Sequence, residues 1–269
     1  INLDTLMIAG KVRADNILVD GLDLTAFRDK KQTDKPYHYL PFPQMALKNL
    51  ELNIKIDSVN IQNAKIKYEE HSEITNKMGA VFFTKMNGTI YNITNDSLTY
   101  LTAPLATMKL NTKLMGKIDL NVDFGFNLIN EYGDHWFNGS VKGFDMTLFN
   151  PVCEPLSAVS IRSGKVERID FNVRLNDYVS DGTMTFIYSD LKIDLLDKVN
   201  SKNKKINKKV IGFLANSFVV KKSNPSGKRE PRIGIVHYKR LKEKSMFHFW
   251  AKSLLSGVKS TLITMEENK

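Results

Sequence analysis

The chain has 269 residues and a net charge of +10, and 42% of its residues are hydrophobic. This composition suffices for one large β domain or two smaller domains with a sizeable core, and no run of 18 apolar residues predicts a membrane-spanning helix. The single cysteine, Cys153, excludes an internal disulfide. Because the sequence starts at Ile1, inside a strand-like pattern, we expect that any signal or anchor lies upstream.

The positive charge is concentrated toward the C-terminus. Residues 197–259 contain 17 Lys and Arg against three acidic residues, a net charge of +14, whereas the remainder carries −4. Only Arg229, Arg232 and Arg240 are arginines in this region, and lysine suits a diffuse anionic surface better than base readout. We therefore expect an anionic partner, and we favour acidic lipid or an acidic protein over nucleic acid.

The first part of the chain consists of strand patterns. Residues 11–28 and 54–68 carry apolar residues at a spacing of two, interrupted by steps of three. A spacing of two predicts a strand with one apolar face, and each step of three predicts a β-bulge or a short turn. The segment 29–43, polar and then rich in proline and aromatic residues, is typical of a loop. Residues 81–91 predict a further strand.

The longest alternation runs from Leu110 to Leu128. Its even positions are apolar, apart from Thr112 and Gly116, and its odd positions are mostly polar. We expect one strand of 19 residues, about 60 Å long at about 3.3 Å per residue, which exceeds the usual strand length several-fold. A strand of this length predicts a large curved sheet or an elongated groove.

Further strands are predicted at 135–148, 159–175, 182–195 and 232–240. Short connections between consecutive strands, several of them rich in Asn and Asp, favour antiparallel meander order. The predicted fold class is mainly β: a long, curved antiparallel sheet, shaped as a half-pipe groove, with two C-terminal amphipathic helices.

Helical periodicity replaces the strand patterns after Leu196. Within residues 198–220, apolar side chains line one helical face, and residues 243–258 carry a second stripe at helical spacing. We therefore divide the chain into a β-rich groove region, 1–196, and a basic helical segment, 197–269. We expect the helical segment to pack on the groove or to cap it, so that both form one structural unit.

The apolar faces of the central strands are the candidate groove. A sheet with an exposed apolar face must be covered by its own helices, by another sheet or by lipid acyl chains. The candidate lipid-groove residues are Leu114, Ile118, Leu120, Val122, Phe124, Phe126, Ile169, Phe171 and Val173.

Aromatic residues next to lysines in the helical segment suggest a membrane contact, because rings enter the headgroup boundary while lysines meet anionic lipid. The alternative is that the stripe of the second helix packs on the sheet as core, and the sequence leaves both open. The candidate membrane-contact residues are Lys204, Lys205, Lys208 and Lys209 in the first helix, and Lys244, Phe247, Phe249, Trp250 and Lys252 in the second.

No catalytic chemistry is indicated. The sequence contains no Gly-rich nucleotide loop, no nucleophile elbow and no zinc-binding helix motif, and its five histidines are scattered. We expect a protein that is not an enzyme and that needs no cofactor and no metal.

Several strings resemble the C-terminal region of AsmA-like proteins, and in particular their Bacteroidota branch. They are VNIQNAKIKYEE at 59–70, FFTKMNGTIYNITND at 82–96, and longer segments at 143–177, 182–198 and 232–260. The resemblance implies a periplasmic β-groove of a large envelope protein, anchored in the inner membrane by an N-terminal segment absent from this sequence. It also implies a relationship to bridge-like lipid transfer proteins and a role in phospholipid transport or outer-membrane integrity, with phospholipid and envelope proteins as partners. An alternative is a structural or protein-interaction domain whose own helices fill the groove.

Overall fold

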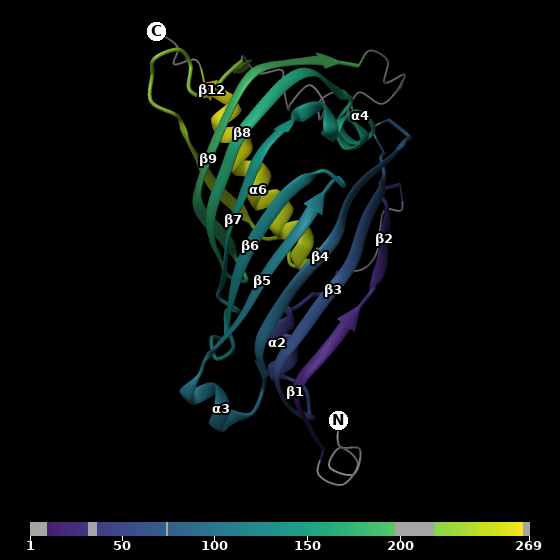
Figure 1. Cartoon of the computed structure of the whole chain (residues 1–269), viewed down its shortest axis with the longest axis vertical. Helices are drawn as coiled ribbons and strands as arrows, with labels where there is room; N and C mark the ends of the chain where they lie inside the picture. The colour runs from purple at the N-terminus through teal and green to yellow at the C-terminus, as the bar shows by residue number, and fades with distance from the viewer. Residues whose placement is uncertain (1–9, 32–36, 74, 197–217, 266–269) are drawn as a thin grey trace.

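The structure is a computed structural model that describes residues 10–31, 37–73, 75–196 and 218–265. Its main element is one ten-stranded sheet in the order β1-β3-β4-β5-β6-β7-β8-β9-β11, with β2 also paired to β3. The sheet is long and curved, and the helix α6 lies along the inside of the curve (Figure 1). The predicted fold class is therefore confirmed.

The strands that form the sheet follow the predicted patterns closely. Their bounds are Lys11–Asp20 (β1), Asp23–Asp29 (β2), Asn53–His71 (β3), Met78–Thr94 (β4), Leu105–Leu114 (β5), Ile118–Asn127 (β6), His135–Asp145 (β7), Val159–Leu175 (β8), Val179–Leu195 (β9) and Ile233–Lys239 (β11). Most neighbours are antiparallel, as expected. However, β1 and β2 both pair with β3 in parallel, one after the other, so the meander prediction is wrong at this edge.

The remaining elements connect and cover these strands. They are the helices Pro43–Lys48 (α2), Ser97–Thr102 (α3), Asn150–Ser157 (α4) and Met246–Leu262 (α6), the 3₁₀ turn Met146–Phe149 (η1), and a small sheet of Phe218–Val220 (β10) with Ile263–Met265 (β12). The second predicted helix is thus α6. The first predicted helix falls mostly on residues 197–217, which lie outside the described residues. Its expected end, Phe218–Val220, is a strand.

The predicted 19-residue strand at 110–128 is wrong, because the chain turns back at its centre. A tight turn joins β5 to β6: the Lys117 N–H donates to the Leu114 carbonyl at 3.2 Å, and Met115 and Gly116 have positive φ. Leu114 pairs directly with Ile118, so even positions face even positions on both strands. The alternation therefore continues through the turn without a change of phase.

The predicted bulges are present only in part, because the pairing runs without a shift through the steps of three at Ala14–Ile17, Leu24–Phe27 and Ile56–Val59. The pairing of β3 with β4 shifts around Ala64, and β8 against β9 shifts around Ser163. Asn63 and Lys85 have positive φ in the middle of their strands, a conformation that is uncommon outside glycine and asparagine. Each bulge increases the local twist, which is consistent with the curvature seen in Figure 1.

Candidate functional site

The face of the sheet that carries α6, here called the inner face, is built from apolar rows that cross the strands. Directly paired residues on neighbouring strands share a face, so the register defines each row. Row one contains Ile17, Val59, Ile90, Met108, Phe124, Phe137, Val173, Gly182 and Val236. Row two contains Val19, Ile61, Gly88, Leu110, Val122, Gly139, Phe171, Met184 and Gly234.

A shorter third row lies further along β3, beyond the bulge. It contains Leu24, Ile66, Phe83, Leu114 and Ile118. Its members come from β2 to β6. The apolar lining of the inner face therefore extends along β3 beyond the positions of rows one and two.

Burial increases along these rows from the β1 edge to the β11 edge. In row one the members on β1 to β5 are only partly buried, whereas Phe137, Val173 and Val236 are at most 2% exposed. The strands β8 and β9 alternate between buried and less buried residues, but β3 has only Ala64 and Glu70 buried among its 19 residues. The inner face thus has a covered half, β6 to β11, and an open half, β1 to β5.

The covered half is closed by α6. Phe249 is 1% exposed, and the Trp250 ring lies 4.9 Å from Phe124 and 5.7 Å from Phe137, measured between ring centroids. The helix approaches β11 closely, because a Cβ on Gly234 would lie 2.5 Å from the Gly257 carbonyl oxygen. Close backbone approach of this kind requires glycine, so these two residues set how deeply α6 sits.

A buried histidine ties α6 to β7. Trp250 Nε1 donates to His135 Nε2 at 3.0 Å, and His135 Nδ1 lies 2.8 Å from the Gly133 carbonyl. Since Nε2 accepts a bond, the ring is neutral with its proton on Nδ1. Burial lowers the pKa of His135 to about 4, with a smaller contribution from the charge of Arg240.

The free edge of β11 is also capped by α6. The Oγ of Ser256 accepts from the His237 N–H at 3.0 Å, and the Oγ of Ser260 accepts from the Ile235 N–H at 2.7 Å. Two outward-facing backbone donors of this edge strand are therefore satisfied by a helix rather than by water.

One end of the covered half is held by a buried ion pair. Arg240 is fully buried and forms an ion pair with Asp177, which also pairs with Lys242 and accepts from Tyr39 Oη at 3.0 Å. The Arg240 guanidinium lies 3.6 Å from the Phe42 ring centroid. Buried charges of this kind persist only when paired, so the cluster fixes the segment before α2 against the segment before α6.

A second group of charged residues lies between α6 and the ends of β2 and β3. Glu70 is 6% exposed and pairs with Lys30, and it accepts from Tyr68 Oη at 2.7 Å. Arg28 is the register partner of Glu70 on β2. Burial lowers the pKa of Lys252 on α6, as do the nearby charges of Lys30, Lys259 and Arg28, while Glu70 raises it.

All nine predicted groove residues belong to the inner face and its two apolar clusters. Phe124, Phe171 and Val173 are buried under α6 or beside it, and Ile118 is buried in the second cluster. The others are partly buried members of the same clusters, namely Leu114, Leu120, Val122, Phe126 and Ile169. The sequence did not identify the β1 to β4 members of the rows as groove residues.

The predicted membrane-contact residues separate into several groups. The prediction of membrane contact is wrong for Phe249, because this residue is buried in the core. Trp250 is partly buried against the sheet. Phe247 is 65% exposed. Lys244 pairs with Glu243 at 3.8 Å, and Lys252 faces the charged group described above. The four lysines Lys204, Lys205, Lys208 and Lys209 lie outside the described residues.

Sequence reasoning also missed the polar residues inside the structure. His135 and Asp177 are buried, but each is an isolated polar residue in the sequence, and its partner is 115 or 63 positions away. No spacing rule connects such pairs. Across the described ranges, no three His, Cys, Asp or Glu side chains gather as a metal site, and none of the helices placed there is long and apolar enough to cross a membrane.

The fold therefore defines the class of protein: an open, curved β-sheet with one apolar inner face, half of it covered by a C-terminal helix. Comparison of the chain with protein-family models, with curated proteins and with solved structures found no match.

Proposed function

We propose that the chain is a non-enzymatic lipid-binding module of a cell-envelope lipid-transfer or outer-membrane assembly system. The observation that carries the proposal is the open half of the inner face. Its apolar residues continue the rows of the core but remain partly exposed, and a contiguous apolar surface of this kind favours a ligand or a partner. Acyl chains lying on β1 to β5 would complete the burial that α6 provides on the other half.

The resemblance to AsmA-like proteins supports an envelope location and a phospholipid ligand. It is consistent with a curved sheet of long strands and an apolar inner face. In this proposal the helix α6 acts as a fixed end wall, and lipid lies beside it rather than beneath it.

The exposed side of α6 supports a contact with an anionic membrane. Phe247 and Leu255 are 65% and 47% exposed, two helical turns apart, and Lys259 is exposed next to Leu255 on the helix. An exposed apolar stripe flanked by lysine is typical of an interfacial helix. Replacement of Phe247 by Ser should reduce co-sedimentation with anionic vesicles and leave the folded structure unchanged.

The two tryptophans provide a direct test of lipid binding. Trp250 lies on the inner face at the boundary of the two halves, whereas Trp136 covers Gly125 on the outer face. A phospholipid with a nitroxide on its acyl chain should quench the Trp136→Phe variant, which retains Trp250, and should leave the Trp250→Phe variant unquenched. Equal quenching of both variants, or none, would contradict lipid binding on the inner face.

A second candidate function is supported by α6 itself, which already fills half of the inner face. In this alternative the chain is a structural or protein-interaction domain. Extraction of the natively purified protein followed by mass spectrometry distinguishes the two candidate functions. Co-purified phospholipid supports lipid transfer, whereas a protein that is stably folded without bound lipid supports the interaction domain.

A further inference from the structure

The charged group between α6 and the ends of β2 and β3 contains more cations than anions. Arg28, Lys30 and Lys252 lie around the carboxylate of Glu70, which is buried and already pairs with Lys30, whereas Asp29 at the end of β2 pairs with His71. Lys252 forms no ion pair with any residue that the structure describes. Uncompensated charge in a partly buried position is unfavourable unless an anion neutralises it.

A histidine on α6 borders the same group. His248 Nδ1 is buried and has no hydrogen-bond partner among the described residues. Burial lowers the pKa of His248 to about 4, and the charges of Lys252, Arg28 and Lys244 lower it further. The imidazole is therefore neutral, and it provides an unused polar atom beside the surplus of positive charge.

The third apolar row begins next to this group. On β2, Leu24 precedes Arg28 by four residues, a separation of about 13 Å at about 3.3 Å per residue. Their partners on β3, Ile66 and Glu70, lie on the same face. An amphiphile with its anionic group at Arg28 and Lys252 and its chain along β3 would therefore cover the partly buried Ile66 and Phe83.

We propose that Arg28, Lys30 and Lys252 bind the phosphate group of a phospholipid whose acyl chain lies along the third row. The proposal rests on the lipid-binding function above and adds the position and polarity of the bound lipid. The phosphate would meet the guanidinium and ammonium groups through charge-assisted hydrogen bonds, which are the strongest available for this anion.

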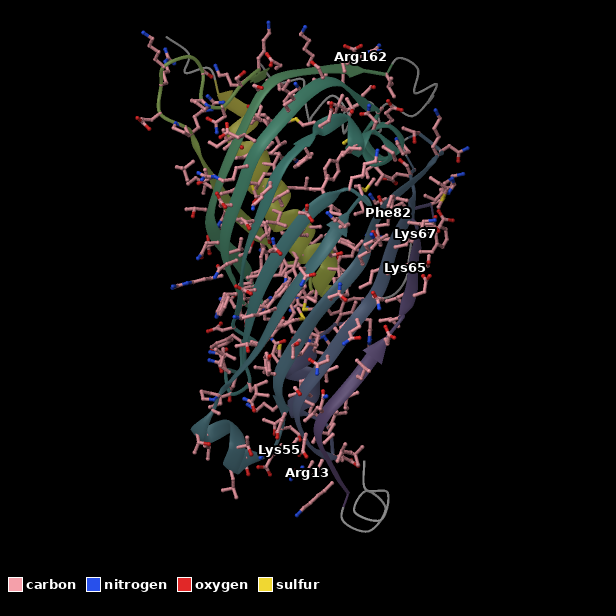
Figure 2. The ribbon with its side chains drawn as sticks, in the orientation of Figure 1. Arg13, Lys55, Lys65, Lys67, Phe82 and Arg162 are labelled. Atoms are coloured by element: carbon pink, nitrogen blue, oxygen red, sulfur yellow. The ribbon has the colours of Figure 1, made fainter. Side chains whose placement is uncertain are left out.

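Three probes separate headgroup recognition from its alternatives. They are monomeric lysophosphatidylglycerol, the monoacylglycerol with the same acyl chain, and inorganic phosphate, each measured by calorimetry with the full chain. Lys252→Gln is the informative variant, because removing this charge relieves repulsion and should not unfold the protein. Lys65→Gln is the matched control. Lys65, labelled in Figure 2, alternates along β3 with Ile66 and so lies on the outer face, and its side chain is 63% exposed.

We expect Lys252→Gln to weaken lysophosphatidylglycerol binding at least tenfold and monoacylglycerol binding less than twofold, with Lys65→Gln unchanged. Unaltered lysophosphatidylglycerol binding in Lys252→Gln would overturn the headgroup site while leaving lipid binding intact. Inorganic phosphate that binds as tightly as the lysolipid would also overturn it, since the site would then recognise free phosphate. If the native protein bound neither lipid, the proposed function itself would fail.

Discussion

The two halves of the inner face carry the same apolar rows but differ in what covers them. On β6 to β11 the rows are buried by α6, and their members form one cluster with Phe249 and Trp250. On β1 to β5 the rows continue in register, yet their side chains remain partly exposed. The comparison shows that the sheet pattern alone does not decide which part is core and which part is a binding surface. The covering elements decide it: α6 over rows one and two, and η1 with α4 next to Ile118 at the end of the third row.

The largest expected effect tests the cover itself. Phe249→Ala should lower the free energy of unfolding by about 3–5 kcal/mol, because a fully buried aromatic ring leaves a cavity. Phe247→Ala, two positions earlier on the exposed side of α6, should change it by less than about 0.5 kcal/mol. Urea denaturation of both variants measures the difference, and equal losses would show that α6 does not cover the sheet as described.

A matched pair in row one compares the two halves directly. Val173→Ala, in the covered half, should cost about 2–3 kcal/mol, and Val59→Ala, in the open half, about 1 kcal/mol, because the cost rises with burial. Adding phospholipid should stabilise the native protein and stabilise Val59→Ala less. Equal costs at the two positions would mean that the open half is as well packed as the covered half.

Acid should destabilise the covered half through its histidine. The pKa of His135 is about 4 in the folded protein, against about 6.5 in an unfolded chain. The unfolded state therefore binds the proton first, and stability is complete above about pH 6.5 and falls as the pH decreases toward 4. We expect a loss of about 2 kcal/mol from His135 between pH 8 and pH 5.

Denaturation at these two pH values measures the loss, with His135→Gln as the control. Glutamine can accept the Trp250 bond without titrating, so the pH dependence of this variant should be smaller. An unchanged pH dependence would assign the acid sensitivity to other groups, of which His248 is the first to examine because burial also lowers its pKa to about 4.

The smallest effect concerns the edge of the covered half. Ser256→Ala removes the acceptor for the His237 N–H and should cost about 1 kcal/mol, the value typical of one hydrogen bond. Hydrogen exchange at the His237 amide should become faster, while amides in the centre of β8 keep their rates. An unaffected His237 amide would show that the helix does not protect this edge.

Much of the sheet was predictable because strands with one apolar face keep a period of two. The turn at Gly116 was not predictable, because the pairing of Leu114 with Ile118 preserves the phase of the alternation across the hairpin. A single Gly was the only signal, and Met115 adopts positive φ beside it against its own preference. A continuous pattern therefore cannot distinguish one long strand from a hairpin of this register.

The helix was predicted correctly, but its most buried face was not. The predicted apolar stripe consists of Met246, Phe247, Trp250, Leu254 and Val258. All of these pack on the sheet, partly buried, except Phe247, which is 65% exposed. The fully buried side is Phe249, Ser253, Gly257 and Thr261, three of which are small or polar. Small residues are needed where the helix backbone approaches β11, and an analysis of hydrophobic periodicity does not detect them.

The two edges of the sheet differ in what they offer to another strand. At β11 the outward N–H groups of Ile235 and His237 are occupied by serine hydroxyls from α6. At the opposite edge, within the described ranges, β1 and β2 pair with β3 alone. Extension of the sheet by strand addition is therefore blocked on the β11 side, where the sheet terminates against its own helix, and the described residues place no such block on the β1–β2 side.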